Sequence, residues 1–198
     1  DVAVTGYRVY QDGVLVSTTT STTLAVTGLA EATEYTFKVE AGDAADNWSA
    51  DGPSTTVQTL DVTAPNWPAG SLLTASSVSD TSLALTWSAA EDNVAVTTYV
   101  ILQDGAEIAS VSASQLTYDV TGLSPFTEYG FKVEAEDAAG HRTTTGPATV
   151  ATTLDLVAPT WPLGSLVASD ATGTSVVLAW TAAEPDVGVT GYKLYQDG

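Results

Sequence analysis

The chain has 198 residues, and its hydrophobic content of 44% supports globular packing and excludes a disordered acidic tail. Its 24 acidic residues outnumber its 5 basic residues, and a formal net charge of −19 argues against nucleic-acid and anionic-membrane partners. It has no cysteine and no stretch that approaches about 18 apolar residues, which excludes disulfides, zinc–thiolate sites, a thiol nucleophile and a membrane-spanning helix.

Two motifs return along the chain with a period of about 93 residues. Residues 1–13 read DVAVTGYRVYQDG, residues 93–105 read NVAVTTYVILQDG, and residues 186–198 read DVGVTGYKLYQDG. The motif DVTAPNWPAGSL at 61–72 returns as DLVAPTWPLGSL at 155–166. A unit of this length is long enough to own a hydrophobic core, so the sequence indicates an array of domains. Such an array favours a structural or spacing role over catalysis.

The first 60 residues predict short strands and tight turns. The Asp-Gly pair at 12–13 lies between two runs that alternate apolar and polar residues, which is the strongest short-range signal for a β-hairpin. Farther along, Tyr35, Phe37, Val39 and Ala41 alternate with polar residues and therefore line one face of a strand. Clusters of Gly, Pro, Asp and Ser separate these runs, as in antiparallel sheets.

The segment after residue 60 predicts an extended linker. Pro65 and Pro68 flank Asn66 and Trp67, and proline fixes φ and removes a hydrogen-bond donor. We therefore expect a semi-rigid connection rather than a floppy tether. Trp67 and its repeat Trp161 either cap the core of their own domain, which the sequence favours, or pack on a neighbour.

Residues 72–154 repeat the strand pattern more completely. Leu83, Leu85 and Trp87 fall on one face of a predicted strand, and a second Asp-Gly pair at 104–105 predicts a second hairpin. In the run 128–136, four apolar residues share one face while acidic and basic residues fall largely on the other; the four are Tyr129, Phe131, Val133 and Ala135. Several such strands per repeat indicate an antiparallel β-sandwich.

These features resemble tandem fibronectin type III domains of the kind found in secreted and surface proteins of bacteria. The matching residues are the Ala-Pro entries at 64–65 and 158–159, the strand-ending Trp87 and Trp180, the TxYxxxQDG motif and the run GLSPFTEYGFKVEAED. Tyr35 and Tyr129 occupy the family's tyrosine-corner position, where the resemblance implies a hydroxyl hydrogen bond that anchors a loop. The resemblance covers essentially the whole chain and implies an all-β fold of tandem immunoglobulin-like antiparallel β-sandwiches.

In the family's strand lettering, the resemblance implies three units. Residues 1–60 would supply strands C to G of a partial domain, residues 61–154 a complete domain, and residues 155–198 strands A to C of another partial domain. The first unit would then expose apolar faces that need cover. Either the sequence is a segment of a longer array, or the last strands of one molecule complete the first sandwich of the next. Because strand C recurs at both ends, the sequence favours the longer array.

Candidate catalytic residues are few, and we expect no enzyme activity and no catalytic site in this segment. The single histidine, His141, lies in a predicted loop, and the aligned residue of the earlier repeat is Asn47. A catalytic base that is asparagine in the sister repeat is improbable, so a solvated loop residue is the simpler interpretation. The sequence has no phosphate-binding glycine loop and no zinc motif.

Acidic residues concentrate where the family's arrangement would bring linkers and loops of successive domains together. Four carboxylates in one place would repel one another without a cation, and Ca²⁺ accepts six to eight oxygen ligands in flexible geometry. We therefore hypothesise calcium ions at the junctions; the alternative is that acidic loops only keep the protein soluble. The candidate ligands are Asp61, Glu91, Asp92 and Asp137, with Asp12 and Glu31 from the preceding domain, and their counterparts Asp155, Glu184, Asp186, Asp43, Asp46 and Asn47.

The sequence thus predicts an extracellular or cell-surface structural protein, in which copies of the repeat neighbour one another in a rod or filament with calcium-stiffened joints. Two alternatives stay open. Because similar modules occur in bacterial polysaccharide-degrading enzymes, the resemblance also implies a spacer in a secreted enzyme. An adhesion module that binds a glycan or a protein is the third option, and it is disfavoured because the aromatic residues mostly fall on predicted core positions.

Overall fold

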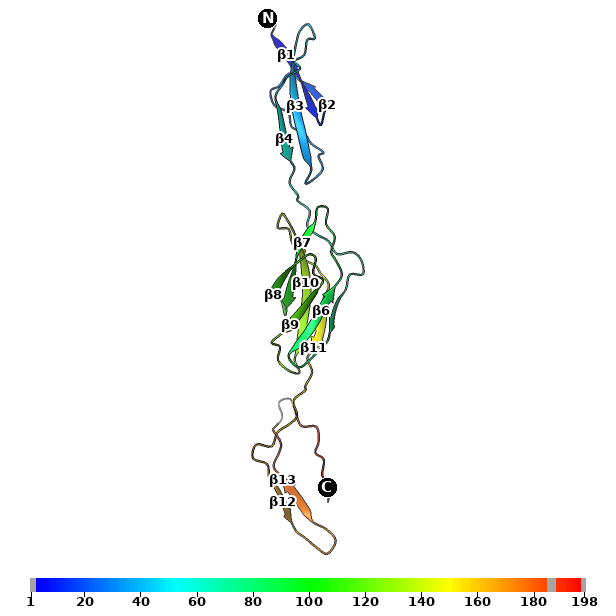
Figure 1. Cartoon of the computed structure of the whole chain (residues 1–198), viewed down its shortest axis with the longest axis vertical. Helices are drawn as coiled ribbons and strands as arrows, with labels where there is room; N and C mark the ends of the chain where they lie inside the picture. The colour runs from blue at the N-terminus through cyan, green and yellow to red at the C-terminus, as the bar shows by residue number, and fades with distance from the viewer. Residues whose placement is uncertain (1–2, 185–187, 197–198) are drawn as a thin grey trace. The chain divides into compact units, whose positions relative to one another are not determined.

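A computed structural model describes residues 3–184 and 188–196, and every regular element within them is a β-strand (Figure 1). The first four strands form one antiparallel sheet in the order β2-β1-β3-β4. They are β1 (Val4–Gln11), β2 (Val14–Thr19), β3 (Glu34–Asp43) and β4 (Ser54–Gln58). The turn between β1 and β2 holds Asp12 at φ 49° and Gly13 at φ 81°, the left-handed conformations that an Asp-Gly hairpin uses. The first predicted hairpin is therefore confirmed.

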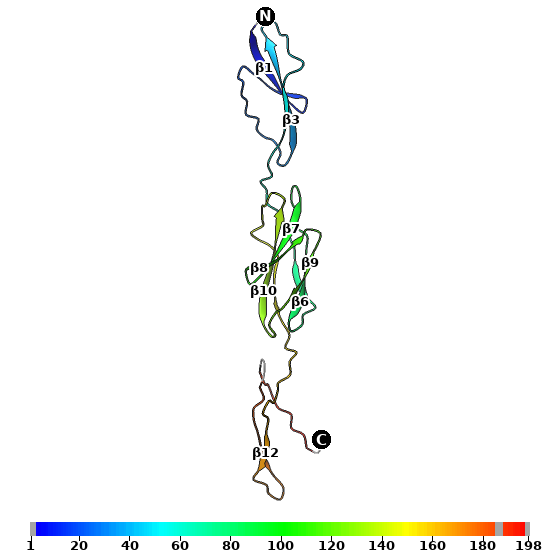
Figure 2. The ribbon, with the colours of Figure 1, turned by 60° about the vertical axis from the view of Figure 1, so that its left-hand side comes forward.

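The next seven strands form the two sheets of a β-sandwich (Figure 2). One sheet has the order β5-β6-β9, built from β5 (Leu73–Ser76), β6 (Ser82–Trp87) and β9 (Thr117–Thr121). The other has the order β11-β10-β7-β8, built from β7 (Val96–Gln103), β8 (Ala106–Ser112), β10 (Glu128–Asp137) and β11 (Ala148–Thr152). We call these seven strands the middle sandwich. The domain boundaries after residues 60 and 154 stay predictions.

The core of the middle sandwich comes from the strand faces that the alternation predicts. Leu85 of β6, Ile101 of β7 and Val133 of β10 are fully buried, and Phe131 is 2% exposed. An edge-on contact joins the two sheets, because the rings of Trp87 and Tyr99 lie 5.7 Å apart. Apolar side chains that alternate along a strand thus meet their counterparts from the opposite sheet.

Trp67 packs against the core of the middle sandwich. Its ring lies 5.8 Å from that of Tyr99, whose hydroxyl accepts a hydrogen bond from the Ala90 amide at 2.9 Å. The same aromatic arrangement recurs near the last strands, where Tyr192 lies 5.7 Å from Trp161 and 5.5 Å from Trp180. The interpretation of these tryptophans as caps of their own core is confirmed for Trp67.

Both tyrosine corners are present. The Tyr129 hydroxyl accepts a hydrogen bond from the Ser124 amide at 2.9 Å, and the Tyr35 hydroxyl accepts one from the Ala30 amide at 2.9 Å. Each corner fastens the loop that precedes the long central strand of its sheet, β3 or β10. The predicted hydroxyl hydrogen bond is therefore confirmed at both positions.

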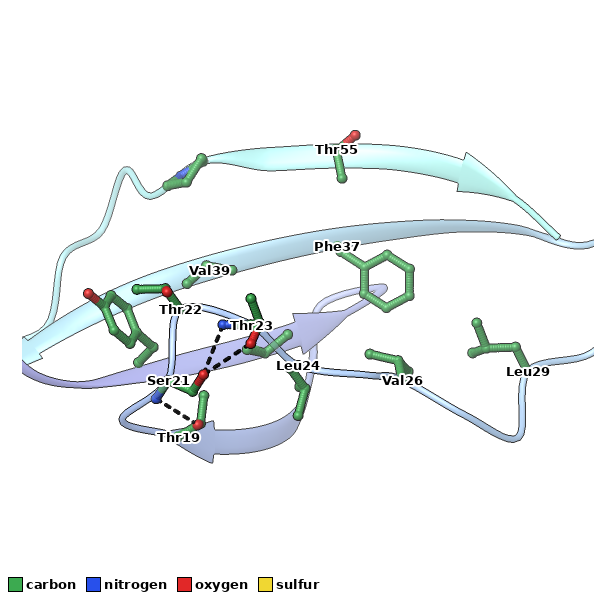
Figure 3. Close-up of a pocket in the computed structure, with 13 residues that line it drawn as sticks. Thr19, Ser21, Thr22, Thr23, Leu24, Val26, Leu29, Phe37, Val39 and Thr55 are labelled. Carbon is green, nitrogen blue, oxygen red and sulfur yellow. Dashed lines mark hydrogen bonds between the residues drawn. The ribbon is translucent and has the colours of Figure 1, made fainter.

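The first sheet differs from the middle sandwich in how its apolar face is covered. Phe37 and Val39 on β3 are only half-buried, whereas the repeat-equivalent Phe131 and Val133 are buried. In the middle sandwich the sheet β5-β6-β9 provides the cover, whereas in the first repeat the irregular segment 21–29 lies over that face (Figure 3). The result is a shallow apolar groove lined by Val9, Leu24, Val26, Leu29, Phe37 and Val39.

The last strands form a two-stranded hairpin, β12 (Leu166–Ser169) paired with β13 (Val177–Trp180). Its apolar side chains are largely exposed: Leu166 at 61%, Val177 at 52% and Trp180 at 40%. Residues 188–196 carry no strand, although their sequence repeats that of β1 and β7. A strand-forming sequence alone therefore does not produce a strand here.

Candidate functional site

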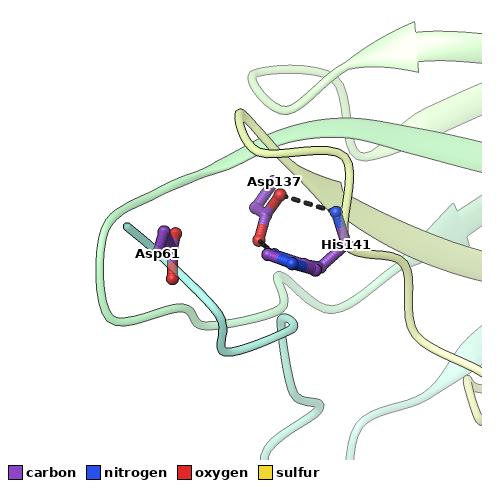
Figure 4. A group of neighbouring side chains, drawn as sticks. All are labelled: Asp61, Asp137 and His141. Atoms are coloured by element: carbon purple, nitrogen blue, oxygen red, sulfur yellow. Dashed lines mark hydrogen bonds and ion pairs between the residues drawn. The ribbon is translucent and has the colours of Figure 1, made fainter. Parts of the chain in front are cut away.

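Three side chains form the one group in the described ranges that offers at least three potential metal-ligand atoms within 4.8 Å of one another: Asp61, Asp137 and His141 (Figure 4). Asp61 lies in the segment that follows β4, Asp137 is the last residue of β10, and His141 lies in the β10–β11 loop. A neighbouring amide also takes part, because Asn93 Nδ2 donates to Asp61 Oδ1 at 3.2 Å. The structure thus brings together two of the predicted ligands and adds His141.

Asp137 is the best-satisfied carboxylate of this group. The His141 backbone amide donates to Asp137 Oδ1 at 2.8 Å, and Asp137 Oδ2 lies 2.9 Å from His141 Nδ1. The Asp137 amide in turn donates to the His141 carbonyl at 3.1 Å. Asp137 is 3% exposed, so it is a buried carboxylate held by the loop that it closes.

The first repeat contains the same closure with a different partner. Asp43 accepts hydrogen bonds from the Asn47 backbone amide at 3.0 Å and from Asn47 Nδ2 at 3.0 Å. The Asp43 amide donates to the Asn47 carbonyl at 3.1 Å. Asn47 and His141 therefore do the same work of closing a loop onto an aspartate, which explains why the two residue types exchange at this position.

Both loop aspartates have lowered pKa values. At Asp137, burial raises the pKa. The hydrogen bonds and charge of His141, together with a hydrogen bond from the Ala139 amide, outweigh burial and leave the pKa below its ordinary value. At Asp43, the Asn47 side chain is the largest cause of a lowered pKa, followed by the Asn47 backbone amide. Ionised carboxylates are therefore the resting state of these loops.

We expect the Asp137 carboxylate to stabilise the fold at pH values above its folded-state pKa and not at pH values below it. A lowered folded-state pKa contributes stability that is present above the unfolded value of about 3.9 and is lost as pH falls through the folded-state pKa. At pH 7 we expect Asp137→Asn to lower the free energy of unfolding by about 1–3 kcal/mol, because one oxygen acceptor is replaced by a donor. Urea unfolding at a series of pH values measures this, and a mutant–wild-type gap that stays constant down to the most acid pH would contradict it.

Most of the other predicted ligands accept hydrogen bonds from nearby groups. Asp12 Oδ1 accepts from the Thr36 amide at 2.8 Å, Asp92 Oδ1 from the Val94 and Ala95 amides at 2.9 Å each, Asp155 Oδ1 from the Val157 amide at 3.1 Å, and Asp46 Oδ1 from Trp48 Nε1 at 2.6 Å. Glu31 binds the linker through the Val62 amide and the Thr63 hydroxyl. The contacts of Asp46, Asp92 and Asp155 are local, because the short aspartate side chain reaches donors close by in the sequence. Those of Asp12 and Glu31 join residues 24 and 31–32 positions apart.

Glu91 and Glu184 enter the structure through their backbones. Glu91 exchanges two backbone hydrogen bonds with Asn66, at 2.8 and 2.9 Å, and Glu184 exchanges two with Thr160, both at 2.9 Å. Each pair ties a linker to the loop that follows the next Trp-ended strand. Asp186 lies outside the described residues. Glu91 and Glu184, which occupy the same position in successive repeats, are thus held by main-chain hydrogen bonds rather than by their carboxylates.

The contacts lend calcium limited support. Ca²⁺ prefers six to eight oxygen ligands, whereas the observed group offers two carboxylates and an imidazole, and both oxygens of Asp137 already contact His141. Asp92 Oδ2 is buried without a hydrogen-bond partner in the described part of the chain. Among the predicted ligands, this oxygen would therefore gain most from a bound cation. The calcium site therefore stays a prediction.

If calcium binds, the midpoint of thermal unfolding must depend on it. For a weak site with a dissociation constant near ~10⁻⁴ M, about 1 mM calcium would add roughly 1.4 kcal/mol per site. Differential scanning calorimetry in EDTA and in added calcium measures this shift, with Asp61→Asn as the variant that should lose it. Equal midpoints in the two buffers would remove calcium from the account.

Sequence reasoning missed His141 and Asn93 as members of the group. The sequence favours a solvated loop residue at His141, whereas in the structure its side chain is partly buried and contacts Asp137. Its alignment with Asn47 was the available signal, because both side chains can donate to a carboxylate four residues earlier.

A membrane-spanning helix, which needs a long apolar stretch, is not found among the described residues.

Comparison with known proteins identifies the fold and relates the chain to enzymes. The family model of the fibronectin type III domain matches residues 68–151. Exoglucanase B of Cellulomonas fimi is 38% identical over 98% of this chain, and chitinase A1 of Niallia circulans is 40% identical over 71% of it. Exoglucanase A of Cellulomonas fimi is 40% identical over 98% of the chain. These matches cover only 18%, 20% and 24% of the three enzymes, so the chain spans less than a quarter of each.

The family match falls on the part of the chain that forms the middle sandwich, with its two sheets and its tyrosine corner. The relatives that match nearly the whole chain extend the likeness to the repeats on either side. The strand pattern, the sheet order and the family match agree with one another, and residues 68–151 form a fibronectin type III domain.

Proposed function

We propose that this chain is a non-catalytic spacer of a secreted polysaccharide-degrading enzyme. The observation that carries the proposal is that the same region matches both exoglucanases and a chitinase, each over a quarter or less of the enzyme. Cellulose and chitin differ in their sugars, so a region common to enzymes that act on one or the other does not select the substrate. The chemistry then belongs to other parts of such enzymes.

The described carboxylates agree with this role. Glycosidases use two carboxylic groups about 5–10 Å apart across a bound sugar, one of them with a raised pKa. Here the acidic residues with shifted pKa values, Glu40, Asp43 and Asp137, are all shifted downward by hydrogen-bond donors around them. Carboxylates held in the ionised form by neighbouring hydrogen-bond donors suit a stable module better than general acid catalysis.

An extracellular location follows from the same proposal. Insoluble polysaccharides cannot enter a cell, so an enzyme that degrades them must act outside it. A protein with 24 acidic residues and no cysteine needs neither a reducing compartment nor disulfide formation to fold. The proline-containing linkers suit a spacer, because proline limits the conformations that a connection can reach.

Two assays test the proposal together. The isolated chain is expected to release no reducing sugar from cellulose or chitin, and the full reading frame is expected to encode a separate hydrolase domain. Substrate hydrolysis by residues 1–198 alone would refute the non-catalytic role. A full reading frame that contains only further copies of this repeat would refute the spacer role.

A self-associating array is the second candidate function, and one observation favours it. The apolar groove over β1 and β3 is open, while the hairpin β12–β13 exposes apolar side chains. In the middle sandwich, the hairpin β5–β6, which occupies the repeat position of β12–β13, covers the face equivalent to that groove. A second copy could therefore supply the missing cover, and a filament would result if the contact propagated.

Sedimentation velocity separates the two candidates. The array predicts concentration-dependent association of the chain, weakened by Leu166→Asp, which places a charge on the exposed face of β12. Compact monomers at all concentrations would leave the spacer as the only candidate. Glycan or protein adhesion has no comparable observation in its favour, since Trp67, Trp87 and Tyr99 pack into the core of the middle sandwich.

A further inference from the structure

The linker after β4 is fastened to the preceding loop by one carboxylate. Glu31 Oε2 accepts a hydrogen bond from the Val62 backbone amide at 3.0 Å. The Thr63 hydroxyl donates to the same carboxylate, at 3.0 Å to Oε1 and 2.9 Å to Oε2. Glu31 therefore grips two successive linker residues from a position 31 residues earlier in the chain.

The turn that carries Glu31 is itself fixed to the end of the first sheet. Its neighbour Ala32 adopts φ 47° and donates its amide to the Leu60 carbonyl at 3.2 Å. The Thr59 amide donates to the Thr33 carbonyl at 3.0 Å, and Thr59 Oγ1 accepts from the Thr33 amide at 3.0 Å. These hydrogen bonds fix the backbone of the turn and thereby the position from which the Glu31 side chain extends.

The middle sandwich repeats this turn without the carboxylate. Phe126 takes the place of Ala32, with φ 46° and an amide that donates to the Leu154 carbonyl at 3.3 Å. The Thr153–Thr127 hydrogen bonds reproduce those between Thr59 and Thr33. However, Pro125 stands where Glu31 does and has no acceptor side chain, and Val157 stands where Thr63 does and has no hydroxyl.

The second half of each linker is held in the same way. The backbone pair between Asn66 and Glu91 has its counterpart in the pair between Thr160 and Glu184. Each linker also closes on its own aspartate, because the Thr63 amide donates to Asp61 Oδ1 at 3.2 Å and the Val157 amide donates to Asp155 Oδ1 at 3.1 Å. The two linkers therefore share these contacts and differ in those that Glu31 makes with the first linker.

We propose that Glu31 is a linker clamp that holds the segment 61–63 against its own repeat, and that the linker after β11 lacks this restraint by sequence. The first linker is then the stiffer of two otherwise similar connections, and bending concentrates in the second. Hydrogen bonds from an amide and a hydroxyl to one carboxylate are charge-assisted, which makes this contact stronger than a neutral turn bond. The proposal concerns the linkers alone and holds whether the chain is a spacer or an array.

Amide hydrogen exchange of the whole chain tests the clamp. The Val62 amide is expected to exchange about tenfold more slowly than Leu156, its repeat counterpart, because a hydrogen-bonded amide must open before it exchanges. Glu31→Ala should raise the Val62 rate to about that of Leu156, whereas Glu31→Gln should keep part of the protection through its remaining oxygen acceptor. Exchange of the core amides of β3 reports that the sheet stays folded in both variants.

A gain-of-clamp variant supplies the matched control. Pro125→Glu combined with Val157→Thr rebuilds the missing contacts, so the exchange of the 156 amide should slow by about tenfold. Equal exchange of Val62 and Leu156 in the unmodified chain would overturn the clamp. So would an unchanged Val62 rate in Glu31→Ala while the β3 amides stay protected.

Discussion

Phe131→Ala is expected to lower the free energy of unfolding of the middle sandwich by about 3–5 kcal/mol. Phe131 is 2% exposed and lies on β10 between the two sheets, so its removal leaves a cavity with little room to collapse. The repeat provides a matched control, because Phe37 occupies the same position on β3 but is only half-buried. Phe37→Ala should cost less than half as much, since the ring already faces an open groove.

Urea unfolding followed by amide exchange of β10 and of β3 measures the two effects separately. The physical reason for the difference is cover: the sheet β5-β6-β9 closes over Phe131, and only the segment 21–29 lies over Phe37. Equal losses for the two variants would mean that the first sheet is as well covered as the second in solution. That result would favour association between copies, because the cover would then come from another molecule.

Gly146→Ala is expected to destabilise the middle sandwich by about 3 kcal/mol through overpacking. A Cβ at this position would lie 1.9 Å from the Val133 carbonyl oxygen and 3.2 Å from Trp67 Nε1. The close approach exists because the segment before β11 runs directly against β10, where the Val133 amide donates to the Pro147 carbonyl at 3.1 Å. Gly52 in the first repeat has the same geometry, with its Cβ position 1.7 Å from the Val39 carbonyl oxygen.

Gly173→Ala is the control for this prediction. A Cβ at Gly173 has nothing within 4 Å, so we expect a change within about 0.5 kcal/mol. Thermal unfolding monitored by near-ultraviolet circular dichroism of the buried tryptophans compares the variants. A Gly146→Ala midpoint equal to that of Gly173→Ala would show that β11 can move away from β10 at no cost.

Strand positions were predictable where local chemistry and a partner strand agree. The Asp-Gly pairs at 12–13 and 104–105 gave both hairpins, because their residues readily take positive φ. The alternating faces of β6 and β10 gave the core of the middle sandwich, because burial follows the two-residue period of a strand. These features depend on short stretches of sequence.

Repeated sequences with different partners show the limit of that reasoning. The motif YDVTG includes most of β9, which pairs with β6, whereas the related LAVTG at 24–28 forms no strand. The motif TGYRVYQ forms most of β1 beside β3, whereas TGYKLYQ at 190–196 forms none. A strand is stabilised by hydrogen bonds to a neighbour, so near-identical segments differ when the neighbour differs.

The candidate site was predicted in part for a similar reason. Family geometry brought Asp61 and Asp137 together, as observed, but the side chains of Asp92 and Asp155 bind amides two or three residues along the chain. Aspartate in a turn has donors within reach before any tertiary contact forms, so local capping competes with metal ligation. The number of acidic residues does not reveal this competition. The four-residue spacing between Asp137 and His141 does indicate it, because it places a donor within reach of the carboxylate.

The measurement that tests the spacer proposal most directly is hydrolysis by the whole protein with and without residues 1–198. Removal of a spacer should leave kcat/KM on a short soluble oligosaccharide within about twofold, because the transition-state contacts are untouched. Activity on the insoluble polymer should fall, because the reach between catalytic and anchoring parts sets the effective concentration of substrate. A large loss of kcat/KM on the soluble substrate would contradict the account, since it would make these sandwiches part of the catalytic unit.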